Sequence, residues 1–311
     1  MKILLTDQVF PDTAVERRLF EEAGHTLIIA GSREDVLAEI VDADAVLNTF
    51  APLPAEVIAT MSRAKIIARY GIGVDNIDVA AATSKGIVVT NVPDYCIEEV
   101  ATHAVSLALA LHRKLARADA ALREGKWGTA AIKPIHRLST LRVGLLGYGR
   151  IGRVVAATMS TFGCAVSVYD PYAGDIAGVL RLGLDELFAT SDVLMLHAPL
   201  TEETRGIVNA TRLAQLPPGA IVINASRGPL VVLDDLLSAL RSGQLGGAAL
   251  DTFPVEPIDP AIFDNVPNLL LTPHTAYYSE EALAESQLKA ATQIIKILAG
   301  QAPDYAVNAA R

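Results

Sequence analysis

The sequence predicts an α/β protein built from two doubly wound parallel sheets. Short apolar runs alternate with amphipathic helical segments along most of the chain, which is the rhythm of βαβ units. The chain has 311 residues, and single hydrophobic cores stop growing near this length, so two domains are expected. Hydrophobic residues make up 51% of the chain, which is enough for two large cores.

The first hundred residues predict one of the two sheets. Helical patterns at Thr13–Ala23 and Ser32–Ile40 separate apolar runs that are typical of buried strands. These strand-like runs are Lys2–Thr6, Thr26–Ala30, Ala45–Asn48, Lys65–Arg69 and Ile87–Thr90. From Ile97 to about Arg123 small and apolar residues follow a helical period, which predicts one long helix near the domain crossover.

A second alternating series predicts the other sheet. Its strand-like runs are Val143–Leu146, Ala165–Tyr169, Val193–Leu196, Ala220–Asn224, Ala248–Leu250 and Leu269–Leu271. The segment from Gly125 to Leu138 fits neither series and is interpreted as an arm or loop. Ser279–Leu298 predicts a terminal helix that can return to the first domain. We therefore expect residues 1–98 and 280–311 to form one domain, with residues 99–279 inserted as the other.

A glycine-rich turn indicates that the inserted domain binds a dinucleotide. Gly147, Gly149 and Gly152 follow an apolar run, and Asp170 follows the next run, eighteen residues after Gly152. This is the fingerprint of a Rossmann domain in its strand–turn–helix–strand–acid context. The first glycine makes the turn, the second lets the pyrophosphate approach, and the third lets helix and strand pack closely. The helix amino terminus then faces the phosphates.

The acidic residue also favours NAD over NADP. Asp170 would accept hydrogen bonds from free ribose hydroxyls but would repel a 2′-phosphate. The residues that follow, Pro171 to Asp175, include no arginine or lysine.

Three ionisable residues follow strand-like runs of the second domain. Arg227, Glu256 and His274 come after the last three runs, and the carboxyl ends of parallel strands share one edge, where ligands bind. A guanidinium can hold a 2-keto acid, an imidazole can move a proton, and a carboxylate can favour the charged imidazole. His274 is also compatible with a buried structural role, and Asp251 with capping a turn.

Composition excludes several other classes of protein. The net charge of −9, without a lysine/arginine block, argues against nucleic-acid binding. No apolar run reaches the length of a membrane span, and the amino terminus turns acidic too early for a signal peptide. The two cysteines have no metal-like spacing and favour a reducing, cytoplasmic setting, and no metal site is expected. His103 and His112 show no evident partner and are interpreted as packing or surface residues.

Four motifs resemble those of the D-isomer-specific 2-hydroxyacid dehydrogenases, which include phosphoglycerate dehydrogenases and C-terminal-binding-protein corepressors. The motifs are residues 144–152, Asn224-Ala-Ser-Arg-Gly228, Leu250-Asp-Thr-Phe-Pro-Val-Glu-Pro257 and Thr272-Pro-His274. The resemblance covers nearly the whole chain, and residues 273–280 are most similar to the corepressor-like branch. It implies a flavodoxin-like substrate-binding domain, a Rossmann NAD-binding domain and a homodimer.

The resemblance also implies roles at matching positions. The catalytic residues would be Arg227, Glu256 and His274. The cofactor would be NAD, bound by Gly147, Gly149, Arg150, Ile151, Gly152, Asp170, His197, Pro199, Thr204, Ala225, Ser226 and Asp251. The substrate would be bound by Gly71, Ile72, Gly73, Arg227 and Tyr277, although Tyr277 is also compatible with a core position.

The expected activity is hydride transfer between NAD(H) and C2 of a small 2-keto acid or D-2-hydroxy acid. Residues 48–51 lack the arginine-serine pair of many phosphoglycerate dehydrogenases, which favours a compact or apolar substrate over a phosphorylated one. The alternative is a corepressor-like scaffold that senses NAD(H) with little catalysis. The sequence does not identify the 2-hydroxy acid or the direction of the reaction.

Overall fold

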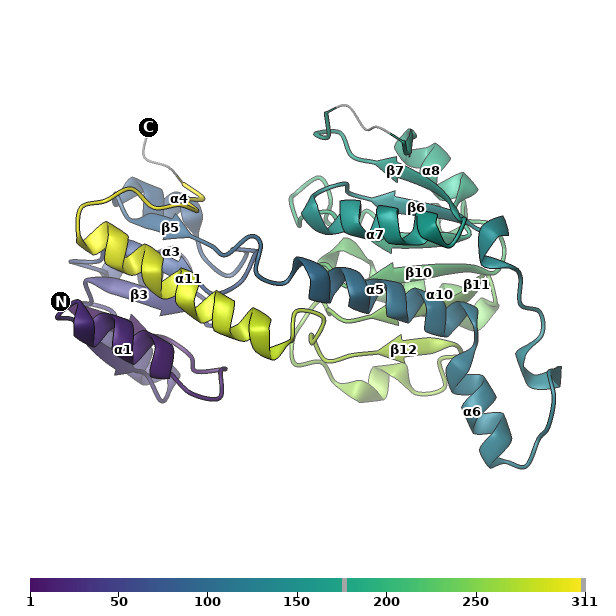
Figure 1. The fold of residues 1–311 in the computed structure, drawn as a ribbon, viewed down its shortest axis with the longest axis horizontal. Helices are drawn as coiled ribbons and strands as arrows, with labels where there is room; N and C mark the ends of the chain where they lie inside the picture. Colours follow the sequence, from purple (N-terminus) through teal and green to yellow (C-terminus); the bar gives the residue numbers. More distant parts are fainter. Residues whose placement is uncertain (175–177, 309–311) are drawn as a thin grey trace. The chain divides into compact units, whose positions relative to one another are not determined.

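A computed structural model of the chain describes residues 1–174 and 178–308 and divides into two compact units (Figure 1). Unit 1 comprises Met1–Tyr95 and Ser279–Arg311, and unit 2 comprises Cys96–Tyr278. Unit 2 is thus inserted into the sequence of unit 1.

Unit 1 contains a five-stranded parallel sheet in the order β2-β1-β3-β4-β5. The strands are β1 (Lys2–Leu5), β2 (Thr26–Ile29), β3 (Ala45–Asn48), β4 (Ile66–Arg69) and β5 (Val88–Thr90). This is the flavodoxin-like order of a doubly wound sheet, as the family resemblance implies. Most residues of β1, β3 and β4 are buried, which explains their nearly continuous apolar character.

Helices cover both faces of this sheet. The terminal helix α11 (Glu280–Leu298) packs against β3, β4 and α1 (Ala14–Glu22). Its first turn is capped by Ser279, whose side chain accepts a hydrogen bond from the Ala282 amide. The other face contributes Leu4, Val46 and Ile67 to a core shared with three helices: α2 (Arg33–Glu39), α3 (Ala55–Thr60) and α4 (Val79–Ser84).

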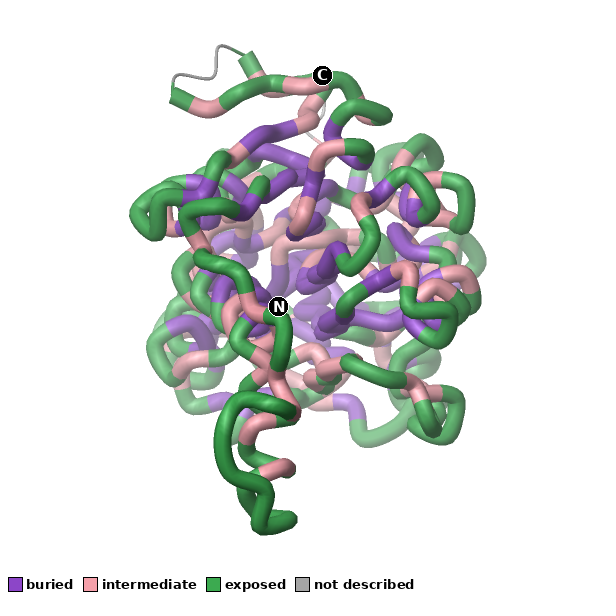
Figure 2. Tube along the Cα trace, turned by 90° about the vertical axis from the view of Figure 1, so that its right-hand side faces the viewer, coloured by how far each residue is buried: buried purple, intermediate pink, exposed green. Residues whose placement is uncertain are grey.

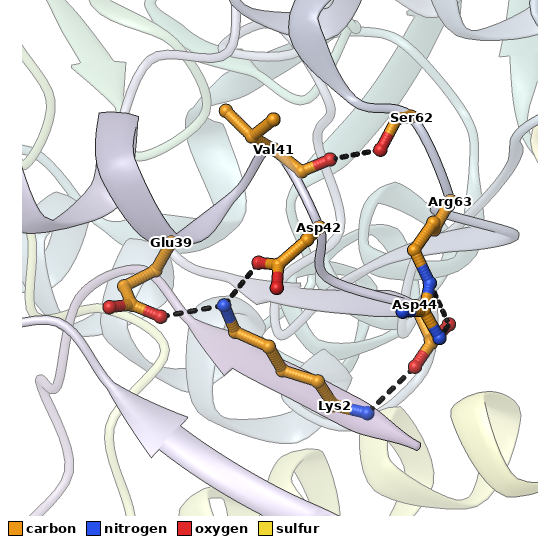
Figure 3. Close-up of polar contacts among 7 residues, drawn as sticks. All are labelled: Lys2, Glu39, Val41, Asp42, Asp44, Ser62 and Arg63. Atoms are coloured by element: carbon orange, nitrogen blue, oxygen red, sulfur yellow. Dashed lines mark hydrogen bonds and ion pairs between the residues drawn. The ribbon is translucent and has the colours of Figure 1, made fainter.

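A cluster of charges closes the amino edge of the unit 1 sheet (Figure 3). Lys2 pairs through Nζ with Glu39, at 2.6 Å, and with Asp42, and its backbone amide donates to Asp44. Arg63 pairs with the other oxygen of Asp44 at 2.8 Å. Each charged side chain in this amino-edge cluster therefore pairs with an opposite charge of the same cluster.

Unit 2 contains a seven-stranded parallel sheet in the order β12-β11-β10-β9-β6-β7-β8. The strands are β6 (Arg142–Leu146), β7 (Ala165–Tyr169), β8 (Leu180–Arg181), β9 (Val193–Leu196), β10 (Ala220–Asn224), β11 (Leu245–Leu250) and β12 (Leu269–Leu271). Sequence patterns miss β8, because two exposed residues carry no period. The sheet reverses its winding between β6 and β9, which is the position where Rossmann domains bind dinucleotides.

The described residues of unit 2 also form the α-helices α5 (Ile97–His112), α6 (Leu115–Arg123), α7 (Arg150–Thr161), α8 (Leu184–Thr190), α9 (Ala210–Leu213) and α10 (Leu233–Ser242). α5 and α7 pack against each other, and α5 also contacts β10 and β11. α8 and α10 contribute Phe188 and Leu236 to a core that includes Leu146, Leu194 and Leu250 from the strands. None of the described helices combines the length and apolarity needed to cross a bilayer.

The prediction of a single helix from Ile97 to about Arg123 is wrong. The helix is interrupted at Lys114, which adopts a left-handed conformation with φ of 54°. α5 ends there because a left-handed residue terminates the helix, and the Lys114 amide donates to Leu111. α6 and the following segment form an arm (residues 113–140), and α6 buries none of its residues. Figure 2 shows the arm as the lowest segment in view, exposed along most of its length.

Candidate functional site

The glycine turn of unit 2 lies at the switch point of the sheet, directly after β6. Gly147 has φ of 102°, and a Cβ atom there would lie 2.6 Å from the backbone of His197, which follows β9. A Cβ atom at Gly152 would lie 2.6 Å from the Gly147 carbonyl oxygen, whereas Gly149 borders open space. The turn therefore requires glycine for packing at two positions and offers an open approach at the third.

The amino terminus of α7 fits an anion. Gly149 caps the helix without a side-chain hydrogen bond, so the first-turn amides of Arg150, Ile151 and Gly152 have no side-chain acceptor. The first turn contains no acid and begins with the exposed Arg150, whose charge opposes the helix dipole. A bound pyrophosphate would satisfy the amides and offset this charge, so these residues fit a dinucleotide.

Asp170 organises the turn on both sides. Its Oδ2 accepts a hydrogen bond from the Tyr148 amide at 2.8 Å, and its Oδ1 accepts from the amides of Tyr172 and Ala173. Arg181 donates to the backbone carbonyls of Asp170 and Ala173 at 2.8 and 3.1 Å. The sequence from Pro171 to Asp175 contains no basic residue, but β8 brings Arg181 beside this loop. Asp175 itself lies outside the described residues.

The segment after β9 contains a buried polar atom without a partner. Nε2 of His197 is buried and makes no hydrogen bond with any described residue. Burial lowers the pKa of His197 to about 4, so the imidazole is neutral at pH 7. Thr204 donates to the Pro199 carbonyl at 2.7 Å and thereby shapes the loop.

The loop after β10 is tied to the same segment. Ser226 Oγ donates to the Ala198 carbonyl at 2.8 Å, next to the buried Ala225. The fully buried Asn224 accepts from the Ser226 amide and donates to the Arg227 carbonyl, so it sets the course of the loop. Sequence reasoning assigned Asn224 no role, although its position at the strand terminus was a usable signal.

Glu256 and His274 are joined by a hydrogen bond. Nδ1 of His274 lies 2.7 Å from Oε2 of Glu256, and Oε1 accepts from the Phe253 amide at 2.8 Å. Burial has the largest effect on Glu256 and raises its pKa. The hydrogen bonds from His274 and Phe253, with the charges of His274 and Arg227, outweigh burial, so the net pKa is lowered. The carboxylate is therefore ionised at neutral pH and holds the imidazole in place.

Arg227 lies on the neighbouring loop because two backbones approach closely. A Cβ atom at Gly228 would lie 1.9 Å from the Phe253 carbonyl carbon, so only glycine lets the loops after β10 and β11 touch. This contact places Arg227 near enough for its charge to lower the pKa of Glu256. Arg227 Nη1 also donates to the Ser226 carbonyl at 2.7 Å.

Asp251 anchors the loop that carries His274. The carboxylate is 1% exposed and accepts hydrogen bonds from Thr272 Oγ1 and from the Thr275 and Ala276 amides. The backbone carbonyl of Asp251 accepts from the His274 amide at 2.8 Å. Asp251 therefore contacts the chain on both sides of His274.

Tyr277 packs edge-on against His274, with ring centroids 6.1 Å apart. Burial, followed by the charges of Asp251 and Cys96, raises the pKa of Tyr277, so its hydroxyl is protonated at neutral pH.

The interpretation of His103 as a packing or surface residue is wrong: its Nε2 lies 3.0 Å from Thr272 Oγ1. No local pattern could reveal this contact, which joins positions 169 residues apart.

Gly71, Ile72 and Gly73 follow β4 in unit 1. The carbonyls of Gly71 and Ile72 accept hydrogen bonds from the Val92 amide and the Asn91 side chain. In contrast, none of the described residues accepts a hydrogen bond from the three amides. A Cβ atom at Gly71 would lie 2.0 Å from the Arg69 guanidinium, so a side chain at this position would displace Arg69. Three successive unpaired amides are suited to an anion.

Residues 105–276, more than half of the chain, match the NAD-binding domain of the D-isomer specific 2-hydroxyacid dehydrogenases. The chain belongs to this family. The turn at Gly147–Gly152 lies within the matched NAD-binding domain. Within the part of the chain that the structure describes, no group of three or more potential ligands could hold a metal ion.

Relatives within the family align along nearly the whole chain. The D-3-phosphoglycerate dehydrogenase of Mycobacterium tuberculosis is 35% identical over 98% of this chain, which spans only 58% of that relative's length. D-lactate dehydrogenase from Aquifex aeolicus, solved with NAD and lactic acid, is 27% identical, with a TM-score of 0.91 and coverage of 99% and 100%. An acyclic imino acid reductase solved with NADPH and D-Arg is also 27% identical, with a TM-score of 0.88 and the same coverage.

Proposed function

We propose that the protein transfers a hydride between NAD(H) and C2 of a small 2-keto acid or D-2-hydroxy acid. The observation that carries this proposal is the His274–Glu256 pair at 2.7 Å, beside the loop of Arg227 and within an NAD-binding domain. The named relatives support it, because each is an enzyme by name, and one was solved with NAD and a 2-hydroxy acid.

The three residues divide the work of the reaction. Bound NADH supplies the hydride for C2. His274, with Nδ1 held by Glu256, would transfer a proton from Nε2 to the carbonyl oxygen and then retain the Nδ1 proton. The ionised Glu256 stabilises the imidazolium before this transfer. Arg227 would bind and polarise the substrate. In the reverse direction, the neutral imidazole accepts the hydroxyl proton.

The proposed cofactor is NAD rather than NADP. Asp170 lies at the end of β7, and its carboxylate holds three backbone amides, so it is fixed where the fingerprint binds the adenosine ribose. Arg181 donates to the backbone of this loop, and we assign it the role of fixing Asp170 rather than of binding a phosphate.

We further propose that the amides of Gly71, Ile72 and Gly73 bind the substrate carboxylate. Their lack of acceptors supports this assignment. The substrate side chain would be compact or apolar: residues 48–51 offer no basic side chain, and their amides from Thr49 to Ala51 already donate to Asp7. A phosphate would therefore find few donors on this loop.

The test is a panel of 2-keto acids assayed by the loss of NADH absorbance. It should include glyoxylate, pyruvate, branched and aromatic members, and a phosphorylated member. We expect turnover with compact members, a D-configured product, and a lower kcat/KM for the phosphorylated member. If NADH binds but no member of the panel is reduced, the enzyme assignment fails in favour of an NAD(H)-sensing binding protein.

We also propose a cytoplasmic homodimer, with the arm at the subunit contact. Trp127 is 91% exposed, and Leu115 and Leu122 are also exposed, which is unusual for large apolar side chains. The chain has only two cysteines, Cys96 and Cys164, and both are buried, which supports a reducing compartment. Trp127→Asp should shift the mass measured by light scattering from dimer to monomer; a monomeric wild-type protein would contradict the proposal.

A further inference from the structure

A second imidazole lies behind the loop that carries His274. His103 belongs to α5, and its side chain is 24% exposed. Its Nε2 lies 3.0 Å from Thr272 Oγ1 and 3.6 Å from Asp251 Oδ1. Thr272 is two residues before His274, so α5 contacts the loop that carries His274 through a polar side chain.

The hydrogen bonds around Asp251 fix the direction of this contact. Thr272 Oγ1 donates to Asp251 Oδ1 at 2.6 Å, and the Thr275 and Ala276 amides donate to the same carboxylate. A threonine hydroxyl has one proton to give, and Thr272 gives it to Asp251. The Thr272 hydroxyl must therefore accept from His103, so the proton of His103 lies on Nε2.

The loop that Thr272 and Asp251 hold carries His274, whose backbone is strained. His274 has φ of 52°, a left-handed conformation that is rare for residues other than glycine. Its amide donates to the carbonyls of Asp251 and Thr272. Such a conformation persists only where the surroundings determine it strongly, and here the Asp251 carboxylate also accepts from the Thr275 and Ala276 amides of the same loop.

We propose that His103 is a positioning residue for the reaction: it donates to Thr272 and thereby holds the Thr272–Asp251 pair that sets the His274 loop. This inference rests on the proposed function for its kinetic consequence, but the direction of the hydrogen bond stands on the geometry alone. His103 touches neither reacting atoms nor cofactor in this role.

The kinetic test compares His103→Gln with His103→Leu. A glutamine Nε2 can still donate to Thr272, whereas leucine fills the space without a donor. We expect kcat to fall about tenfold in the leucine variant, the effect of about one lost hydrogen bond. The glutamine variant should stay within about twofold of wild type, and KM for NADH should not change in either. Equal activity in the two variants, whether high or low, would overturn the proposal.

Thr272 provides the matched control. Thr272→Ser keeps the hydroxyl and should retain activity, whereas Thr272→Val should resemble His103→Leu. The double variant His103→Leu/Thr272→Val should be no worse than either single variant, because both break one pathway. Additive losses would show that the two residues act independently and would overturn the proposal.

A measurement without turnover separates this inference from the proposed function. Nitrogen-15 spectra of the six histidines at pH 8, with His103 assigned from its glutamine variant, should show a proton on Nε2 of His103. The His274 ring signals should move in His103→Leu and stay in place in His103→Gln. A proton on Nδ1 alone, or unmoved His274 signals, would overturn the positioning role; an inactive wild type with the expected spectra would overturn only the proposed function.

Discussion

The amino-edge cluster of unit 1 and the carboxyl edge of the unit 2 sheet differ in whether their polar groups pair with one another. In the amino-edge cluster of unit 1, Lys2 pairs with Glu39 and Asp42, and Arg63 pairs with Asp44 (Figure 3). At the carboxyl edge of the unit 2 sheet, α7 begins without a side-chain cap, and the buried Nε2 of His197 has no partner among the described residues.

The comparison shows that density of charge does not mark the site. The charges of the amino-edge cluster pair with one another and stabilise the fold. The carboxyl edge of unit 2 also carries charged side chains, but its amides, its buried ring nitrogen and the part-exposed His274–Glu256 pair suit a ligand. Parallel strands also end at this edge, where their following loops converge.

The largest effect that would confirm this contrast is expected for His274→Asn. Asparagine tolerates the left-handed backbone of this position but does not exchange protons near neutral pH. We expect kcat to fall about 10³-fold, with the Kd for NADH, measured by fluorescence, unchanged. A loss below tenfold would remove His274 from the chemistry.

The next largest effect is expected for Glu256→Gln, at about 10²-fold in kcat/KM for keto-acid reduction. The neutral amide would no longer stabilise the imidazolium, so the alkaline limb of the pH profile should move to lower pH. Glu256→Asp is the control and should leave the limb closer to its wild-type position. An unshifted limb in the glutamine variant would contradict the role of the carboxylate charge.

A smaller effect concerns the cofactor. Asp170→Ala removes the carboxylate that would bind the ribose hydroxyls and repel a 2′-phosphate, so the ratio of kcat/KM with NADH to that with NADPH should fall about 10- to 100-fold. Arg181→Ala serves as the comparison, because it leaves the carboxylate in place. An unaltered ratio in Asp170→Ala would remove the ribose assignment.

The smallest effect is expected in the amino-edge cluster. Lys2→Met removes exposed ion pairs but keeps the aliphatic stem, so Tm should fall by less than about 4 °C. The kcat/KM should stay within about twofold of wild type. A large loss of activity without a change in Tm would show that the contrast between the two edges is false.

Local sequence patterns predicted most of the fold. The buried strands were visible as apolar runs, because a parallel strand covered on both faces is apolar throughout. Two features of the fold were not visible in these patterns. β8 is too short to carry a period, and the break at Lys114 depends on a single backbone conformation that composition does not reveal. The carboxyl-edge positions of Arg227, Glu256 and His274 followed from the strands that precede them.

The sequence by itself determined the two-sheet fold, the dinucleotide turn and the family, because each depends on neighbouring residues with a fixed spacing. Only the tertiary structure decided which groups meet: the His274 and Glu256 side chains, the Gly228 and Phe253 backbones, and the His103 and Thr272 side chains. These contacts join separate loops and helices, so they depend on strand order and packing rather than on any local period. The direction of the hydrogen bond from His103 required the whole set of donors around Asp251, which no single motif contains.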